Sequence, residues 1–476
     1  MGLQRLRHHA GPFVVAAALL TAALWTLGAD AQPPAPSKGS ATSDALKIPY
    51  TLYKLDNGLT VILHEDHTQP LVAVNVGVKV GSRDERPQRT GFAHLFEHLM
   101  FMGTERVPEK MFDEWMETEG AWNNASTSQD RTVYHSVGPS HTLPLLLWLE
   151  ADRLSALGEQ IDQDKLDSQR KVVRNERRQQ VENKPYAKVR LRLPELLFPA
   201  DHPYHHPVIG SHADLEAAAV ADVRGFFLTW YVPQNTSLVV AGDFDPATTR
   251  PLIERYFGAI KTGNPLPNRP VPGQPAELAG VVRDTLEDNV TLPKVVMAWL
   301  SPAVYAPGDA ELDVLSEILS SGKASRLYKA LVYDQQLAQR VNAYQSSMTL
   351  RSYFVVAAVA RPGVSLEQIE QAIDSEIAKL RAEKMSEQEL QRAKNQYETG
   401  YVARMESLAT RASMLNGYYA HHGNPGWAGA DLKRYLDVTT TGALQVAAKV
   451  LDPDRRVILH VVPKGQGGAS PKGAAQ

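Results

Sequence analysis

The sequence contains no cysteine. The chain therefore cannot form a disulfide framework, cannot be anchored as a lipoprotein through cysteine, and cannot bind zinc through thiolates. A strong charge of one sign is also absent, because 50 Lys and Arg face 53 Asp and Glu, for a formal net charge of −3. We expect no surface that binds nucleic acid, and the basic run over residues 170–178 indicates a solvated helix face.

Long hydrophobic runs are missing as well. The apolar run over residues 13–27 has about 15 residues, whereas a helix that crosses a bilayer needs about 20. Two arginines precede this run, and Ala29-Asp30-Ala31 offers a small-x-small cleavage site. These features predict a signal peptide over residues 1–31, and hence a periplasmic or secreted protein of the bacterial cell envelope with no stable membrane anchor after cleavage. An uncleaved membrane anchor is the alternative.

Segments rich in Pro, Gly and small polar residues divide the mature chain. They predict a disordered linker over residues 32–47, an interdomain linker over 262–277 and a disordered tail over 464–476. The remaining segments, 48–261 and 278–463, form two halves of similar length.

Both halves show the same order of signals: an alternating apolar strand, an apolar-periodic helix and a closing strand. The expected strands are 71–80 and 237–241 in the first half, and 295–300 and 456–462 in the second. This pattern indicates a duplicated α/β unit, with chance similarity of two α/β halves as the alternative.

The segment His94-Leu95-Phe96-Glu97-His98 has the spacing of a catalytic zinc site. In a helix, at about 100° per residue, His94 and His98 lie one turn apart and Glu97 lies on the adjacent flank. Thr90 and Gly91 are reasonable residues for the helix start. The opposite face is apolar and consists of Phe92, Leu95, Phe96, Leu99 and Met100.

A catalytic zinc needs a third protein ligand. We expect it on a long charged helix over residues 164–182, where Glu176 shares a face with Val172 and Val173 and is therefore held inward. Glu97 stands one residue too early to bind the same ion beside both imidazoles. Its expected role is that of a general base, which takes a proton from the zinc-bound water and passes it to a leaving amine. An ordinary polar stripe on a helix is the alternative for the motif.

The order His-x-x-Glu-His is the inverzincin signature, and the chain here resembles the M16 family of zinc metallopeptidases, the relatives of pitrilysin and mitochondrial processing peptidase. The resemblance runs from about Lys47 to Pro463. It implies an α+β fold of two homologous domains, each a mixed β-sheet packed with helices on one face. It also implies one Zn²⁺ per chain with His94, His98 and Glu176 as ligands and Glu97 as general base.

The resemblance implies further site residues. Asn124 and Ala125 are similar to the family's strand at the edge of the cleft, where an extended substrate adds as a further strand. The alternation of Asp130, Thr132 and Tyr134 supports a strand in this region.

The sequence departs from the family pattern in two respects. Gln169 stands where many relatives carry a second glutamate that supports the site, so its role is in doubt. In the second half, Val332 and Gln339 occupy the positions of an Arg and a Tyr that contact the substrate carbonyl in active relatives.

The chain therefore resembles the metal-bearing subunit of a two-chain peptidase whose homologous partner supplies the Arg/Tyr pair. We expect a zinc-dependent endopeptidase that hydrolyses peptides or unfolded polypeptide segments. The alternatives are a self-sufficient homodimeric peptidase and a non-catalytic binding or scaffold subunit.

Other candidate ligands are less favourable. Aligning Gly103 with Gly322 places Asp313, Ser316 and Glu317 in the second half where the motif stands in the first, so the second copy has no imidazole there. The group His202, His205 and His206 is interrupted by prolines and indicates a structural loop. His421-His422 before Gly423 indicates a helix end.

Overall fold

The computed structural model describes residues 46–269 and 276–465. The expected signal peptide (1–31), most of the expected linker 32–47, residues 270–275 of the expected interdomain linker and residues 466–476 of the expected tail lie outside the described residues. Within the two described ranges, no helix is both long and apolar enough to cross a membrane.

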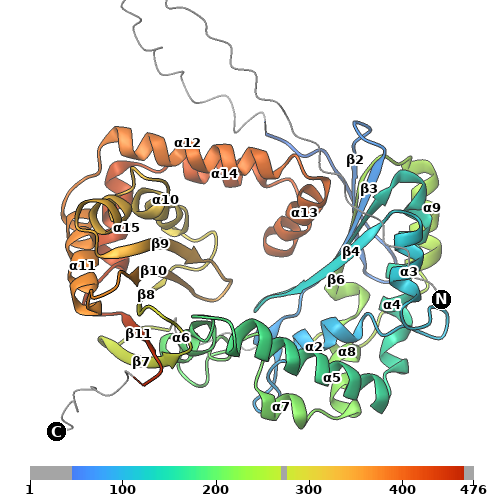
Figure 1. Ribbon diagram of the computed structural model, residues 1–476. Coiled ribbons are helices and arrows are strands. Elements are labelled where there is room, and N and C mark those ends of the chain that lie inside the picture. Colours follow the sequence, from blue (N-terminus) through green and yellow to red (C-terminus); the bar gives the residue numbers. More distant parts are fainter. Residues whose placement is uncertain (1–45, 270–275, 466–476) are drawn as a thin grey trace, which may run out of the picture. The chain divides into compact units, whose positions relative to one another are not determined.

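The first half forms a six-stranded mixed sheet (Figure 1). Its strands, in spatial order, are β1 (Thr51–Lys54), β2 (Thr60–Glu65), β6 (Thr236–Gly242), β3 (Leu71–Val78), β5 (Thr132–Pro139) and β4 (Trp122–Thr127). Only the pair β2 and β6 is parallel, and β4 is an edge strand.

The second half forms a five-stranded sheet. Its spatial order is β7 (Val282–Asp288), β11 (Val457–Pro463), β8 (Lys294–Ser301), β10 (Ser352–Ala360) and β9 (Ala338–Ser346). The strands that come first and last in the sequence of this half, β7 and β11, are again the parallel pair. Apart from β1, the two sheets therefore have the same topology, which confirms the expected duplicated α+β fold.

The helices follow the chain in two groups. The first half contains α2 (Phe92–Leu99), α3 (Met111–Thr118), α4 (Leu143–Gln160), α5 (Gln163–Arg177), α6 (Val189–Leu197), α7 (His212–Glu216), α8 (Val220–Trp230) and α9 (Pro246–Phe257). The second half contains α10 (Asp309–Ser320), α11 (Leu366–Ala382), α12 (Glu387–Arg404), α13 (Leu408–His422), α14 (Ala428–Leu436) and α15 (Thr440–Val450).

Each sheet buries one face against helices of its own half. In β3 the alternate residues Val72, Val74 and Val76 join the core that contains apolar side chains of α2, α4 and α8. The period of two in a strand sends the intervening Ala73 to the opposite face. The expectation of helices from each half on one face of its sheet is confirmed.

The opposite faces are covered by an exchange of helices, which the sequence did not predict. Helix α13 of the second half packs on β3 and β6 of the first sheet, where Leu415 is fully buried beside Ala73. Helix α6 of the first half packs on β8 and β11 of the second sheet through Leu193 and Leu197. Each sheet is thus sandwiched, and the exchange ties the two halves together.

Three local predictions need correction. Val172, expected to share an inward face with Glu176 and Val173, is 44% exposed, and of the two valines only Val173 is buried. Asp130 lies in the turn before β5 and not in a strand, because Ser128 closes that turn by accepting hydrogen bonds from the backbone of Asp130 and Arg131. The expected helix over residues 164–182 is regular only as far as Arg177 and continues as a wider, π-type turn over Arg178–Glu182. Such π-type turns are frequent at functional sites.

Candidate metal centre

Helix α2 is fixed at its N-terminus by contacts from distant parts of the first half. Gly91 starts the helix with φ +88°, and a Cβ there would lie 2.8 Å from the backbone oxygen of Ile209. The fully buried Glu85 carboxylate accepts hydrogen bonds from the backbone N–H groups of Gly91 (2.9 Å) and Ala93 (2.8 Å). Burial raises the pKa of Glu85, and the two donors oppose that shift. Glu85 thus satisfies N–H groups that a helix start otherwise leaves unpaired.

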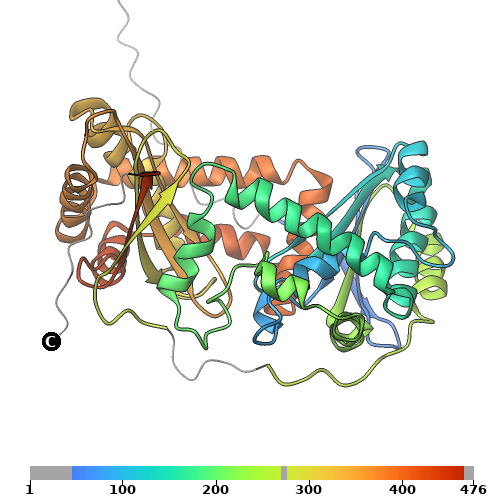
Figure 2. The ribbon, with the colours of Figure 1, turned by 60° about the horizontal axis from the view of Figure 1, so that its bottom comes forward.

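The structure brings His94, His98 and Glu176 together. Helices α2 and α5 lie side by side (Figures 1 and 2), and Glu176 on α5 faces the two rings on α2. Its Oε2 lies 3.6 Å from Nε2 of His94 and 3.3 Å from Nε2 of His98. One ligand atom from each of the three residues lies within 4.8 Å of the others.

The protonation of this group suits a cation. Burial, followed by the neighbouring His98 ring, lowers the pKa of His94 to about 4, so its imidazole is neutral near pH 7. The His98 ring beside it lowers the pKa of Glu176, which is therefore a carboxylate. A neutral imidazole and a carboxylate are the protonation states that bind zinc.

The distances from Glu176 Oε2 to the Nε2 atoms of His94 and His98 also fit zinc. Tetrahedral zinc with bonds of about 2.0–2.1 Å separates its ligand atoms by about 3.3 Å. The carboxylate oxygen Oε2 of Glu176 is buried and has no hydrogen-bond partner among the described residues, which is costly unless a cation is bound. Within the described ranges, these three residues form the only such cluster of His, Asp or Glu.

Glu97 lies next to the cluster but is held differently. The residue is 9% exposed, and its Oε2 accepts a hydrogen bond of 2.5 Å from the hydroxyl of Thr127 at the end of β4. Burial raises the pKa of Glu97, and the Thr127 hydroxyl opposes that shift. The carboxylate is therefore oriented by a strand and not by the metal-binding side chains.

The edge strand β4 carries the residues expected to bind substrate. Asn124 is exposed, and Ala125 is half-buried against the core of the first half. β4 has a neighbour on one side only, so its other side is a free strand edge. The backbone N–H of Ala125 donates to the side-chain oxygen of Asn124 at 2.8 Å. Through Thr127, this strand is joined directly to Glu97.

Gln169 does not contact the three clustered residues by any hydrogen bond of the described structure. Its side-chain amide lies on the preceding turns of α5 and donates to the sulfur of Met102 at 2.7 Å. The structure therefore places Gln169 against a core methionine.

The described part of the second half has no equivalent of the cluster. Asp313 on α10 is half-buried and accepts a hydrogen bond of 3.0 Å from the Tyr435 hydroxyl, and desolvation raises its pKa to about 7. Ser316 donates to the backbone of its own helix at Asp313. Val332 packs against the second core, and Gln339 is exposed on the edge strand β9.

The two other histidine groups considered in the sequence lie where expected, one in a loop and one at a helix end. His202 stacks on Phe198 with ring centroids 4.6 Å apart, and His205 bonds the backbone of the same loop at Phe198. His421 and His422 form the last turn of α13, which ends at Gly423 with φ +66°. Within the described residues, none of them joins a metal-binding cluster.

Sequence reasoning missed two residues of the site. Thr127 lies two residues after the expected substrate-binding residue Ala125, but no pattern in the sequence indicates its contact to Glu97. The sequence gives no indication that Glu85 belongs to the site. A loop without a regular period separates it from its partners Gly91 and Ala93, so their contact cannot be predicted from spacing.

Comparisons with known proteins give matches over most of the chain. A family model described as insulinase (peptidase family M16) matches residues 60–205, and one described as peptidase M16 inactive domain matches residues 218–397. The chain is 28% identical to the zinc protease PqqE of Helicobacter pylori over 414 residues, which cover 86% of this chain and 92% of the relative.

Two further matches come from a plant and from a solved structure. The Arabidopsis thaliana protein named "Probable mitochondrial-processing peptidase subunit beta, mitochondrial" is 24% identical over 364 residues, with 75% of this chain and 67% of the relative covered. The crystal structure of a protease from Helicobacter pylori matches with a TM-score of 0.82 at 25% identity, over 88% of this chain and 100% of the other. The chain belongs to the M16 family of peptidases.

Proposed function

We propose that this chain is a zinc-dependent endopeptidase that hydrolyses peptides or unfolded polypeptide segments. The observation that carries the proposal is the convergence of His94, His98 and Glu176 beside a separately held carboxylate, Glu97. Relatives named zinc protease support it.

In this proposal His94, His98 and Glu176 hold one zinc ion per chain. When bound, zinc supplies Lewis acidity, which lowers the pKa of a coordinated water and polarises the substrate carbonyl. Glu97 accepts the proton of the attacking water and delivers it to the leaving amine. Thr127 holds the Glu97 carboxylate in place through its hydroxyl.

The edge strand β4 binds the substrate in an extended conformation. Backbone groups of Asn124 and Ala125 pair with the substrate as a further strand, so affinity comes mainly from main-chain hydrogen bonds. This binding mode tolerates many sequences and requires an unfolded segment. Gln169 supports the helix through Met102 and does not take part in the chemistry.

A peptidase assay tests the proposal. The mature chain, loaded with zinc, is incubated with an unstructured peptide that carries a fluorophore and a quencher. We expect cleavage that stops on addition of a chelator and returns with added zinc. A scaffold subunit would show no cleavage under any of these conditions, including in the presence of a homologous partner.

We further propose that full turnover requires a homologous chain that carries an Arg/Tyr pair. Val332 and Gln339 offer no pair of donors for a substrate oxyanion, since one is apolar and the other is a neutral amide. The name of the plant relative, a subunit beta, supports a multi-chain assembly for that protein. Full turnover by this chain alone, as a monomer or homodimer, would contradict the two-chain proposal and leave the peptidase proposal intact.

The domain boundaries and the cellular location of the chain are part of the same proposal. The domains are residues 48–261, which carry the zinc site, and residues 278–463, which do not. Residues 1–31 are removed as a signal peptide, and the chain acts in the periplasm or outside the cell.

Replacing Thr127 with Val tests the orientation of the general base. The variant keeps the size of the side chain but removes the hydrogen bond to Glu97, so we expect kcat to fall about tenfold, as for the loss of one hydrogen bond to a charged group. Zinc content should not change. Thr118→Val, on an exposed turn of α3, is the matched control. An unchanged kcat, or loss of zinc together with activity, would show that Thr127 does not act through Glu97.

A further inference from the structure

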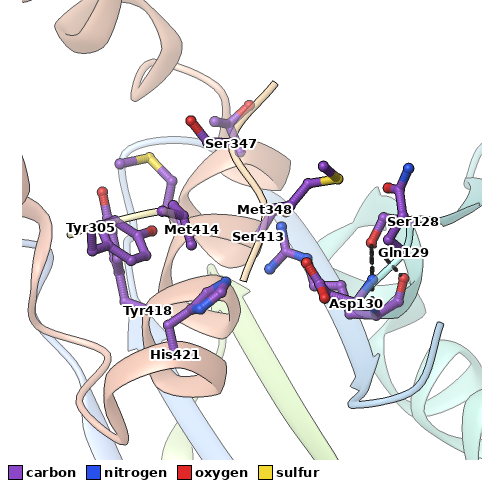
Figure 3. A pocket seen from close by; sticks show the side chains of 14 residues that line it. Ser128, Gln129, Asp130, Tyr305, Ser347, Met348, Ser413, Met414, Tyr418 and His421 are labelled. Atoms are coloured by element: carbon purple, nitrogen blue, oxygen red, sulfur yellow. Dashed lines mark hydrogen bonds between the residues drawn. The ribbon is translucent and has the colours of Figure 1, made fainter. Parts of the chain in front are cut away.

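A cavity of about 390 Å³ lies where the two halves meet and has no part in the proposed hydrolysis. Figure 3 shows its labelled lining: the turn from Ser128 to Asp130 on one side, and Tyr418 and His421 of α13 with Tyr305 on the other. The residues of α13 that line it recur at helical spacing, so one face of this helix forms the wall; they are Thr410, Ser413, Met414, Gly417, Tyr418 and His421.

Arg131 lines this cavity, and no carboxylate of the described residues forms an ion pair with it. Among the described residues, its guanidinium makes no hydrogen bond and no ion pair. Burial lowers the pKa of Arg131, and the nearby Tyr305 and Asp130 oppose that shift. Gly417 provides the space for the side chain, since a Cβ at that position would lie 2.8 Å from Nη1 of Arg131.

The neighbouring carboxylate is already committed to other groups. Oδ1 of Asp130 accepts hydrogen bonds from Arg83 (2.9 Å) and from the Tyr204 hydroxyl (2.5 Å), and Oδ2 accepts one from the backbone N–H of Thr349 (3.0 Å). Asp130 therefore accepts three hydrogen bonds, and none of them comes from Arg131. No carboxylate oxygen of the described chain lies within ion-pair distance of the Arg131 guanidinium.

The other titratable groups around the cavity do not supply the missing charge. Burial, followed by Arg131, lowers the pKa of His421 to about 4, so this ring is neutral near pH 7. Asp431, behind Tyr418, is bonded to the Tyr418 hydroxyl (2.7 Å) and to Arg434 (2.9 Å). A partly desolvated cation without a partner is costly, and a bound anion would remove that cost.

The lining also indicates what kind of anion fits. The planar fork of a guanidinium matches a carboxylate with two parallel hydrogen bonds. The hydroxyls of Ser413 and Thr410 make no hydrogen bond among the described residues and are available as further donors. Met348 and Met414 give the cavity an apolar wall, which favours an anion with an apolar body over inorganic phosphate. The volume is that of a site for a small organic molecule.

We propose that this cavity binds a small organic carboxylate with an apolar body, with Arg131 as its anchor. The ligand is either a free organic acid or the C-terminal residue of a peptide, which share this chemistry. Since the cavity is lined by a turn of the first half and by α13 of the second, the ligand would link the two halves. The turn directly follows Thr127 in the sequence, so an occupied site would also steady the strand that orients Glu97.

Calorimetric titration of the mature chain tests this proposal independently of peptidase activity. The probes are hexanoate, N-acetylmethionine, N-acetylmethionine amide and inorganic phosphate. We expect both carboxylates to bind and the amide and phosphate to bind at least about tenfold more weakly, because they lack the charge or the apolar body. Tighter binding of N-acetylmethionine than of hexanoate would identify a peptide C-terminus as the source, and the reverse would identify a free acid.

Two variants and a control complete the test. Arg131→Gln should weaken binding of the carboxylates at least about tenfold. Gly417→Ala should weaken it by displacing the guanidinium, and Arg340→Gln, at an exposed arginine on β9, should not change it. Thermal unfolding of each variant shows whether it is folded. Equal binding of acid and amide, an unchanged affinity in folded Arg131→Gln, or no binding of either carboxylate would overturn the proposal.

Discussion

The Glu97→Gln variant will keep its zinc and lose peptide turnover by about 10²–10⁴-fold, the usual contribution of a positioned general base. Glutamine has the size of glutamate and can still accept the hydrogen bond from Thr127, so the side chain stays in place. It has no basic oxygen with which to take a proton. The three metal donors are untouched, because the Glu97 carboxylate is bonded to Thr127 and does not belong to the cluster.

The measurement combines zinc content by mass spectrometry with kcat for the fluorogenic peptide. The matched control is Glu114→Gln, which makes the same chemical change at an exposed position of α3 and should have wild-type kcat and zinc content. A Glu97→Gln protein that keeps both zinc and at least a third of the wild-type kcat would remove Glu97 from the proposed mechanism. Loss of zinc in this variant would instead make Glu97 a metal ligand.

Periodicity was enough to predict much of this site. The spacing of His94 and His98 places both rings on one helix face, and Val173, three residues before Glu176, lies on the buried side of α5, whereas Val172 is exposed. Both inferences use a single helix at a time, where the period of 3.6 residues fixes the geometry. The structure brings the two faces together at 3.3 Å, between Glu176 Oε2 and His98 Nε2.

Contacts between unrelated elements were not predictable in the same way. Thr127 and Glu97 meet because an edge strand passes over a helix, and no pattern in either segment specifies the other. The exchange of α6 and α13 could not be predicted for the same reason, since it depends on contacts between elements that are far apart in the sequence. An apolar helix face shows that the helix is covered, but it does not show which of two similar sheets covers it.

The end of α5 shows a further limit. Its charged sequence continues helically to Glu182, yet the hydrogen bonding widens after Arg177. Here the side chains bond to the segment that leads into α7: Arg177 donates to the backbone oxygen of Gly210, and Glu182 bonds the ring of His212, the first residue of α7. Such tertiary contacts override local helix propensity, which amounts to less than about 1 kcal/mol per residue.

Removing any one of the three proposed ligands should remove the metal. In His94→Ala, His98→Ala or Glu176→Ala only two donors remain. Removing a residue that merely hydrogen-bonds to a metal ligand lowers metal affinity by roughly 10–100-fold, so we expect a larger fall in zinc affinity when a ligand itself is removed. Peptide turnover should fall with the zinc content. The exposed His141, whose side chain is 67% accessible, provides the control His141→Ala, which should retain zinc and activity.

Thermal unfolding gives a second readout that does not depend on catalysis. A ligand that binds only the folded protein stabilises it, by about 2.7 kcal/mol at a free concentration 100 times its dissociation constant. The wild-type chain should therefore unfold at a higher temperature with zinc than with a chelator, and this difference should vanish in each of the three variants. If all three variants kept zinc and the zinc-dependent shift, the metal would bind elsewhere, and the close approach of Glu176 to the two rings would be a structural ion pair between α2 and α5.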